Sequence, residues 1–180
     1  MTLIAREGPR RAVLWATDIL LGLRTARQRQ PRRKDLDGAV VHTMPTGEEI
    51  EASLQIFKGS FDLPSEARVI RRVARVFPWA SVVLVRDGAV DGYCWFRILP
   101  RRRAILLSMA VRPAGRGRGY GRAMLSFGLS VLRDAGVEVA DLDVEEGNET
   151  AIRLYTSLGF ARRSLDPRRK VMRMRKALGP

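Results

Sequence analysis

The chain has one cysteine and one histidine in 180 residues, and only 7% of its residues are aromatic. The single cysteine, Cys94, excludes a disulfide within the chain and is typical of a protein from a reducing compartment. Cys94 lies in the apolar run 93–96, so we expect a buried structural thiol. His42 lies in a strand-like segment, and we expect it to pack rather than to catalyse. The length fits one domain, and 46% hydrophobic residues are ample for its core.

The chain also lacks an apolar run long enough to cross a bilayer. The run at residues 12–23 is flanked by arginines and falls short of the roughly 20 residues that a spanning helix needs. Asp18 inside it, and the lack of a small-residue cleavage site, argue against a signal peptide. Three interpretations stay open: packing on the domain or on a second subunit of a homodimer, contact with an anionic membrane surface, or disorder. We predict a cytoplasmic protein, peripheral to the membrane if this run binds lipid.

Acidic residues are missing from residues 97–122, which hold eight arginines. The net charge is +14, with further basic excess in residues 1–38 and 161–180. Arg101–Arg103 follow Pro100 in a predicted hairpin turn, where we expect them to be solvated. A basic surface favours RNA or the ribosome, but the chain shows no nucleic-acid module, so we do not expect nucleic acid as the partner.

Hydrophobic periodicity predicts an alternation of strands and helices after a basic arm. We assign residues 1–38 to this arm, with 24–38 as a polar linker, and residues 39–180 to the folded domain. Helix 47–58 opens with the capping box Thr46-x-x-Glu49, and Asp87-Gly88 marks a hairpin. The other predicted elements are a helix at 65–77, strands at 39–44, 81–86, 89–98 and 104–111, a helix at 120–135, a strand at 138–144, a helix at 149–158, and strands at 160–165 and 170–176.

A glycine-rich turn lies between the strand 104–111 and the helix 120–135. Residues 111–121 read Val-Arg-Pro-Ala-Gly-Arg-Gly-Arg-Gly-Tyr-Gly. Glycines let the backbone approach a ligand, and N–H groups at a helix N-terminus attract anions. The turn therefore predicts a phosphate site. Its spacing excludes a nucleotide P-loop and disfavours a Rossmann site.

A second motif lies downstream, where residues 148–160 read Asn-Glu-Thr-Ala-Ile-Arg-Leu-Tyr-Thr-Ser-Leu-Gly-Phe. Asn148 is a good N-cap, apolar residues recur at helical spacing, and Gly159 ends the helix. Together, Arg-x-x-Gly-x-Gly and Asn-x-x-Ala-x-x-Leu-Tyr-x-x-Leu-Gly-Phe resemble the acetyl-CoA loop and the last conserved helix of the GNAT acetyltransferase superfamily. The resemblance covers roughly residues 39–176.

This resemblance implies the GNAT acyl-CoA N-acyltransferase fold, an α/β architecture with a central mixed, mostly antiparallel sheet flanked by helices. It implies an acyltransferase that uses acetyl-CoA as co-substrate and no metal. Backbone groups of one strand would bind the pantetheine arm, the loop would bind the pyrophosphate, and the N-cap of the last helix would contact cofactor or acceptor. The implied cofactor-binding residues are Met109, Val111, Arg116, Gly117, Arg118, Gly119, Tyr120, Gly121, Arg122 and Asn148.

The resemblance is greatest to the bacterial ribosomal-protein N-terminal alanine acetyltransferases. It implies that Tyr155 protonates the departing CoA sulfur. Those enzymes read Leu-Glu-Val where this chain reads Leu-Asp-Val, so Asp143 is the implied general base, one methylene shorter and able to act through a water. Asp141 shares its face by strand alternation. Glu145 and Glu146 are further candidates.

The implied reaction is direct attack of a primary amine on acetyl-CoA in a ternary complex. A carboxylate base deprotonates an α-amine, with a pKa near 8, more easily than a lysine. In the family the acceptor binds near the loops that correspond to residues 59–64 and 166–170, and the basic residues of the second favour an acidic or peptide-like acceptor. Three functions stay open: a protein N-terminal acetyltransferase, a small-molecule N-acetyltransferase for an acidic or phosphorylated amine, and a non-catalytic CoA- or RNA-binding module.

Overall fold

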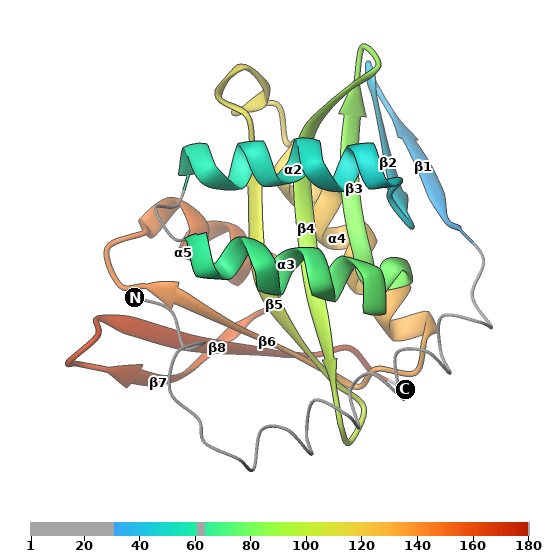
Figure 1. Cartoon of the computed structure of the whole chain (residues 1–180). Helices are drawn as coiled ribbons and strands as arrows, with labels where there is room; N and C mark the ends of the chain where they lie inside the picture. Colours follow the sequence, from blue (N-terminus) through green and yellow to red (C-terminus); the bar gives the residue numbers. More distant parts are fainter. Residues whose placement is uncertain (1–30, 61–63, 180) are drawn as a thin grey trace.

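A computed structural model describes residues 31–60 and 64–179 and shows an eight-stranded sheet with helices on both faces (Figure 1). The strand order is β1-β2-β3-β4-β5-β6-β8-β7, and every neighbouring pair is antiparallel except β5 and β6. This confirms the predicted mixed, mostly antiparallel sheet. The apolar run 12–23 lies outside the described residues.

The elements follow the predicted order, and no predicted end is displaced by more than two residues. The strands are β1 (Arg33–Leu36), β2 (Ala39–Thr43), β3 (Ser81–Arg86), β4 (Ala89–Leu99), β5 (Arg103–Val111), β6 (Val139–Glu145), β7 (Ala161–Asp166) and β8 (Val171–Ala177). The helices are α2 (Gly47–Ser60), α3 (Pro64–Val76), α4 (Tyr120–Asp134) and α5 (Glu149–Ser157), with 3-10 turns at Pro78–Ala80 and Pro113–Gly115.

Local sequence signals explain several of these ends. The predicted capping box forms: the Thr46 N–H donates to Glu49 Oε2 at 2.7 Å, and the Glu49 N–H donates to Thr46 Oγ1 at 3.2 Å. Asp87 and Gly88 both take positive φ angles, 52° and 75°, as a tight hairpin between twisted strands requires. None of the helices in the described ranges is long and apolar enough to cross a membrane.

Strand β1 corrects the prediction of a linker over residues 24–38. It pairs antiparallel with β2, from Arg33 opposite His42 to Leu36 opposite Ala39. Its sequence, Arg-Lys-Asp-Leu, has no β-branched or aromatic residue and buries little, so periodicity could not reveal it. The strand exists because β2 offers an edge for it. Residues 33–36, which we assigned to the arm, therefore belong to the sheet.

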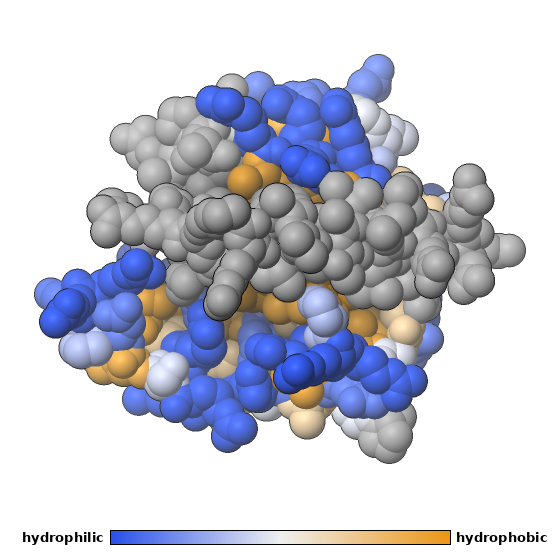
Figure 2. All heavy atoms as spheres, turned by 60° about the horizontal axis from the view of Figure 1, so that its bottom comes forward, coloured by the Kyte–Doolittle hydropathy of each residue, from blue (hydrophilic) through white to orange (hydrophobic). Residues whose placement is uncertain are grey.

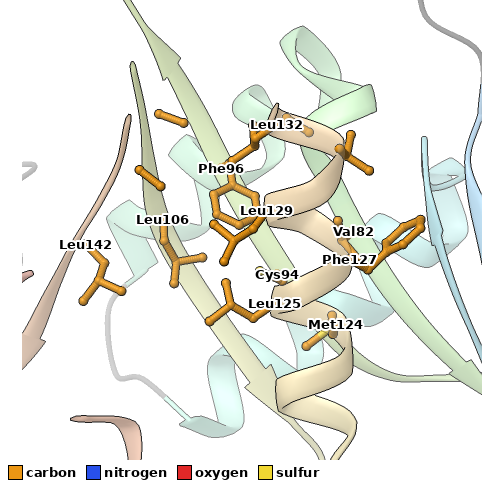
Figure 3. Packing of buried hydrophobic residues seen from close by; sticks show 14 of the residues in the cluster. Val82, Cys94, Phe96, Leu106, Met124, Leu125, Phe127, Leu129, Leu132 and Leu142 are labelled. Atoms are coloured by element: carbon orange, nitrogen blue, oxygen red, sulfur yellow. The ribbon is translucent and has the colours of Figure 1, made fainter. Parts of the chain in front are cut away.

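The core has two layers, one on each face of the sheet. Residues of α4 pack on one face against side chains of β3, β4, β5 and β6, as Figure 3 shows for Leu125, Leu129 and Leu132 beside Phe96 and Leu106. Helices α2 and α3 cover the opposite face. Cys94 is free and buried in the α4 layer, where burial raises the pKa of its thiol. The predicted structural thiol is confirmed.

The core predicts a contrast between two leucine truncations. Leu125 on α4 is fully buried, whereas Leu165 on β7 is 45% exposed. Leu125→Ala should lower the free energy of unfolding by about 2–5 kcal/mol, because it leaves a cavity in a packed interior. Leu165→Ala should change it by about 0.5 kcal/mol or less. Urea unfolding measures both; equal losses would contradict the described packing.

Candidate functional site

The central strands β5 and β6 part in the middle of the sheet. Their parallel pairing covers only Arg103 to Leu106 on β5 and Val139 to Leu142 on β6. Beyond it, β5 keeps pairing with β4 as far as Val111, and β6 keeps pairing with β8 as far as Glu145. In Figure 1, β5 continues upward while β6 turns toward the left. The facing edges of residues 107–111 and 143–145 are therefore unpaired with each other.

A β-bulge marks the start of this divergence. On β4, Trp95 and Phe96 are neighbours, but their partners on β5 are Ser108 and Leu106, so Leu107 is the extra residue. A bulge bends its strand and increases its twist. The bend turns the upper half of β5 away from β6, which continues along its partner β8.

The glycine-rich loop connects the divergent end of β5 to α4. Gly117 and Gly119 have φ angles of 76° and 78°, which L side chains rarely adopt. A Cβ atom built on either would meet nothing within 4 Å, so space lies above both. Gly119 precedes the first residue of α4, whose first turn contains no acidic side chain.

Several backbone N–H groups of this loop have no acceptor within the described part of the protein. The first N–H groups of a helix have no acceptor within the helix. In the described ranges, no protein acceptor bonds the N–H groups of residues 117–122, whereas the Arg116 N–H donates to the Pro113 carbonyl and the Ala123 N–H to the Gly119 carbonyl. The loop therefore offers several free donors at the positive end of a helix dipole, which suits a pyrophosphate.

Three elements meet at Gly121, the second residue of α4. A Cβ atom there would lie 3.8 Å from Met109 Cε, 3.9 Å from Val111 Cγ2 and 3.9 Å from Leu154 Cδ2. The structure thus brings together the end of β5, the glycine-rich loop and α5, three parts of the chain that hold predicted site residues.

The three loop arginines differ in their contacts. Arg116 Nε donates to the Val111 carbonyl at 3.2 Å, closing the end of β5. Arg122 Nη1 donates to Ser157 Oγ at 2.6 Å, tying the first turn of α4 to the last turn of α5. Arg118 is exposed. Asn148 caps α5 as predicted: its Oδ1 accepts the Ala151 N–H at 3.1 Å.

Tyr155 lies on the buried face of α5, 8% exposed and edge-on to Phe160, with ring centroids 6.0 Å apart. Burial, and to a lesser degree the nearby Cys94, raises the pKa of its phenol. Tyr155 therefore keeps its proton throughout the physiological range. A protonated phenol can act as a proton donor.

Asp143 follows Leu142, the last residue of β6 that pairs with β5. On the other side of β6 it lies opposite Arg173 of β8. Two parallel hydrogen bonds join them: Nε to Oδ1 and Nη2 to Oδ2, both 2.8 Å. Asp143 is 15% exposed and Arg173 40%. The hydrogen bond to Asp143 raises the pKa of Arg173. Each carboxylate oxygen still has a second lone pair that could accept a proton from water.

Asp141 shares this face, as predicted from alternation, but it is not solvated. Its side chain is 3% exposed and accepts hydrogen bonds from Arg175 and Arg103. Burial opposes its ionisation and is the largest single influence, yet the two arginines together outweigh it and lower the pKa of Asp141. Arg101 and Arg102 are exposed, as predicted for the hairpin turn. Arg103 differs: its side chain is 39% exposed but is paired with Asp141, because a buried carboxylate requires a counter-charge. Arg173 and Arg175 were not predicted, although their spacing of two matches that of the aspartates.

The remaining polar candidates lie apart from this region. His42 is 22% exposed and bonds Glu49 Oε1 at 2.9 Å through Nε2. In the turn after β7, Asp166 Oδ1 accepts the N–H groups of Arg168 and Arg169. Every β7 residue is exposed, and hydrophilic side chains are spread over much of the coloured surface on this lower side of the molecule (Figure 2). Across residues 31–60 and 64–179, no three His, Cys, Asp or Glu side chains could hold a metal together.

Comparison with known proteins identifies the family of this chain. Residues 50–160 match the acetyltransferase (GNAT) family. A mycothiol acetyltransferase from Thermomonospora curvata is 33% identical over 138 residues, which cover 72% of this chain and 46% of that protein. The chain thus spans about half the length of the curated relatives it matches.

Solved structures share the fold at lower identity. The ribosomal-protein-S18-alanine N-acetyltransferase from Escherichia coli has a TM-score of 0.66 at 19% identity, over 79% of this chain and 95% of that one. An acetyltransferase structure from Salmonella typhimurium with its cofactor acetyl-CoA has a TM-score of 0.66 at 21% identity, over 78% of this chain and 94% of that one. The chain belongs to the acetyltransferase (GNAT) family. This confirms the family that the two sequence motifs indicated.

The Asp141 cluster predicts a pH-dependent contribution to stability. Because its folded pKa lies below the ordinary value of about 3.9, this contribution is complete above about pH 5 and disappears as pH falls through the folded pKa. Asp141→Asn should cost about 2 kcal/mol at pH 7, since the partner arginines are partly exposed, and less at pH 3.

Urea unfolding at both pH values tests this. Asp35→Asn is the control, because that carboxylate pairs with Arg33 at 74% exposure. It should cost about 0.5 kcal/mol or less. An Asp141→Asn cost that does not shrink at low pH would contradict the assignment.

Proposed function

We propose that this protein transfers the acetyl group of acetyl-CoA to a primary amine by direct attack in a ternary complex. The observation that carries the proposal is the row of unbonded N–H groups at residues 117–122, beside the unpaired edge of β5. Phosphate oxygens fit the loop, where Gly117 and Gly119 leave open space. An extended amide-bearing arm fits an unpaired strand edge.

Acetyl transfer from a thioester makes three chemical demands. The amine must be neutral, the developing oxyanion needs hydrogen-bond donors, and the departing thiolate benefits from a proton. In this proposal Met109 and Val111 hold the pantetheine arm through their backbone groups, and the Val111 N–H polarises the carbonyl. Tyr155 protonates the sulfur.

Asp143 is the proposed base, acting through a water. Both of its oxygens are bound by Arg173, so direct contact with the amine would compete with that ion pair. A bridging water could donate a hydrogen bond to a remaining lone pair of Asp143. It would also span the extra distance to the amine that results from the side chain being one methylene shorter than glutamate. Arg173 then keeps Asp143 in place and ionised.

The proposed acceptor is a protein N-terminal α-amine. The modest basicity of an α-amine supports this choice, because a carboxylate removes a proton more easily from an ammonium group with a pKa near 8 than from the more basic lysine. A small-molecule amine is the second candidate, supported by the identity of 33% to a protein named mycothiol acetyltransferase.

Single-turnover assays with labelled acetyl-CoA, against a panel of peptides with free N-termini and of acidic small amines, test the proposal. Label on a peptide N-terminus supports the first acceptor class, and label on a small amine supports the second. Tight RNA binding without any transfer would contradict both and favour a non-catalytic module.

Gly119→Val should weaken CoA binding by about tenfold or more, because its side chain enters the phosphate space. Gly136→Val is the matched control: Gly136 has φ 81° at the opposite end of α4. Both variants should lose about 1–2 kcal/mol of stability to the left-handed backbone. Calorimetry that finds equal CoA affinity in the two variants would show that the loop does not bind phosphate.

Tyr155→Phe should lower kcat by roughly 10²–10⁴-fold with little change in CoA affinity, because the proton is needed only as the thiolate leaves. The phenol has no protein hydrogen-bond partner in the part of the chain that the structure describes, so its loss should not disturb the core. Steady-state kinetics and calorimetry together measure this. An undiminished kcat would reduce Tyr155 to a packing residue.

Asp143→Asn should flatten the acidic limb of the kcat/KM profile, because a neutral amide has no base to lose at low pH. Asp166→Asn, on the exposed β7 turn, should keep the limb. An unchanged limb in Asp143→Asn would exclude Asp143 as the base.

A further inference from the structure

One buried ion pair lies beneath the phosphate loop and has no part in the proposed chemistry. Asp91 is the extra residue of a second β-bulge: Leu84 pairs with Gly92 and Val85 with Val90, which leaves Asp91 without an opposite residue on β3. Bulges re-aim side chains and are frequent next to active sites. Here the bulge directs a carboxylate at the loop.

The carboxylate of Asp91 is in tight contact with the loop. A Cβ atom built on Gly115 would lie 2.6 Å from Asp91 Oδ2 and 3.0 Å from Val111 Cγ1. The Asp91 carbonyl accepts the Arg112 N–H at 2.8 Å. Arg112 and Gly115 are joined by their own hydrogen bond of 2.9 Å, so Asp91 holds both ends of the turn that opens the loop.

Arg86 forms an ion pair with Asp91. Its Nε donates to Asp91 Oδ2 at 2.8 Å, and the side chains of Arg86 and Asp91 are 22% and 8% exposed. Arg86 also interacts electrostatically with Tyr120, the first residue of α4. The pair therefore contacts the loop where it leaves β5.

Stability alone is a weak explanation for this pair. A buried ion pair recovers little more than its desolvation cost, and apolar residues of similar volume often stabilise as well. A charged pair that is held by a hydrogen bond and packs against the backbone of Gly115 is better explained by the need to keep the loop in one conformation.

We propose that the Asp91–Arg86 ion pair is a positioning element for the phosphate loop. It fixes Gly115, and through it the direction of the N–H groups of residues 117–122, and so sets the affinity for the phosphate-bearing part of CoA. The inference rests on the proposed use of acetyl-CoA, and neither residue touches the reacting atoms.

A double-mutant cycle on CoA binding tests the inference. Gly115→Ala in the full-length chain should raise the Kd for CoA about tenfold, because its methyl group collides with Asp91. In an Asp91→Ala background the same change should alter Kd less than about twofold. Effects that multiply independently in the double variant would overturn the proposal.

Two further measurements separate positioning from a general fold defect. Asp91→Asn keeps the side-chain volume and should weaken CoA binding while leaving the Kd for pantetheine, which lacks the pyrophosphate, unchanged in an NMR titration. Asp134→Asn, which breaks an ion pair with Arg32 at the other end of α4, should change neither. Equal CoA affinity in wild type and Asp91→Asn would overturn the inference, whereas wild type that fails to bind CoA would overturn the proposed function itself.

Discussion

The arrangement of the site depends on the short parallel pairing between β5 and β6. Because this pairing ends at Leu106 and Leu142, each strand follows its other neighbour, β5 with β4 and β6 with β8. Two backbone edges are thereby left without partners inside the protein. An unpaired edge in the middle of a sheet is costly unless something else bonds it, so the divergence favours a ligand with amide groups.

The positive charge of the chain serves at least two separate purposes. Arg116 and Arg122 connect the loop to β5 and α5, close to the place proposed for phosphates. Arg103, Arg173 and Arg175 instead neutralise two aspartates on β6, and that cluster is a counter-charge system rather than an anion site. A total of +14 therefore says less about the partner than the position of each arginine does.

Much of the fold could be predicted from the sequence, because its signals are local. The capping box before α2, the hairpin at Asp87-Gly88 and the glycine loop before α4 each act within a few residues. Strand β1 escaped prediction, since its pairing with β2 leaves no signal in its own sequence. The ion pairs of Asp141 and Asp143 also escaped, because they join strands some thirty residues apart, and so did the Asp91 support, which depends on a bulge that no composition reveals.

Hydrogen exchange with and without acetyl-CoA tests the central claim most directly. The account predicts that the amides of residues 117–122, and those of residues 107–111 that do not bond to β4, exchange readily in the free protein and become protected when acetyl-CoA binds. The amides of the exposed edge strand β7 should not change. If acetyl-CoA binds but the exchange of both segments stays unchanged, the account is contradicted.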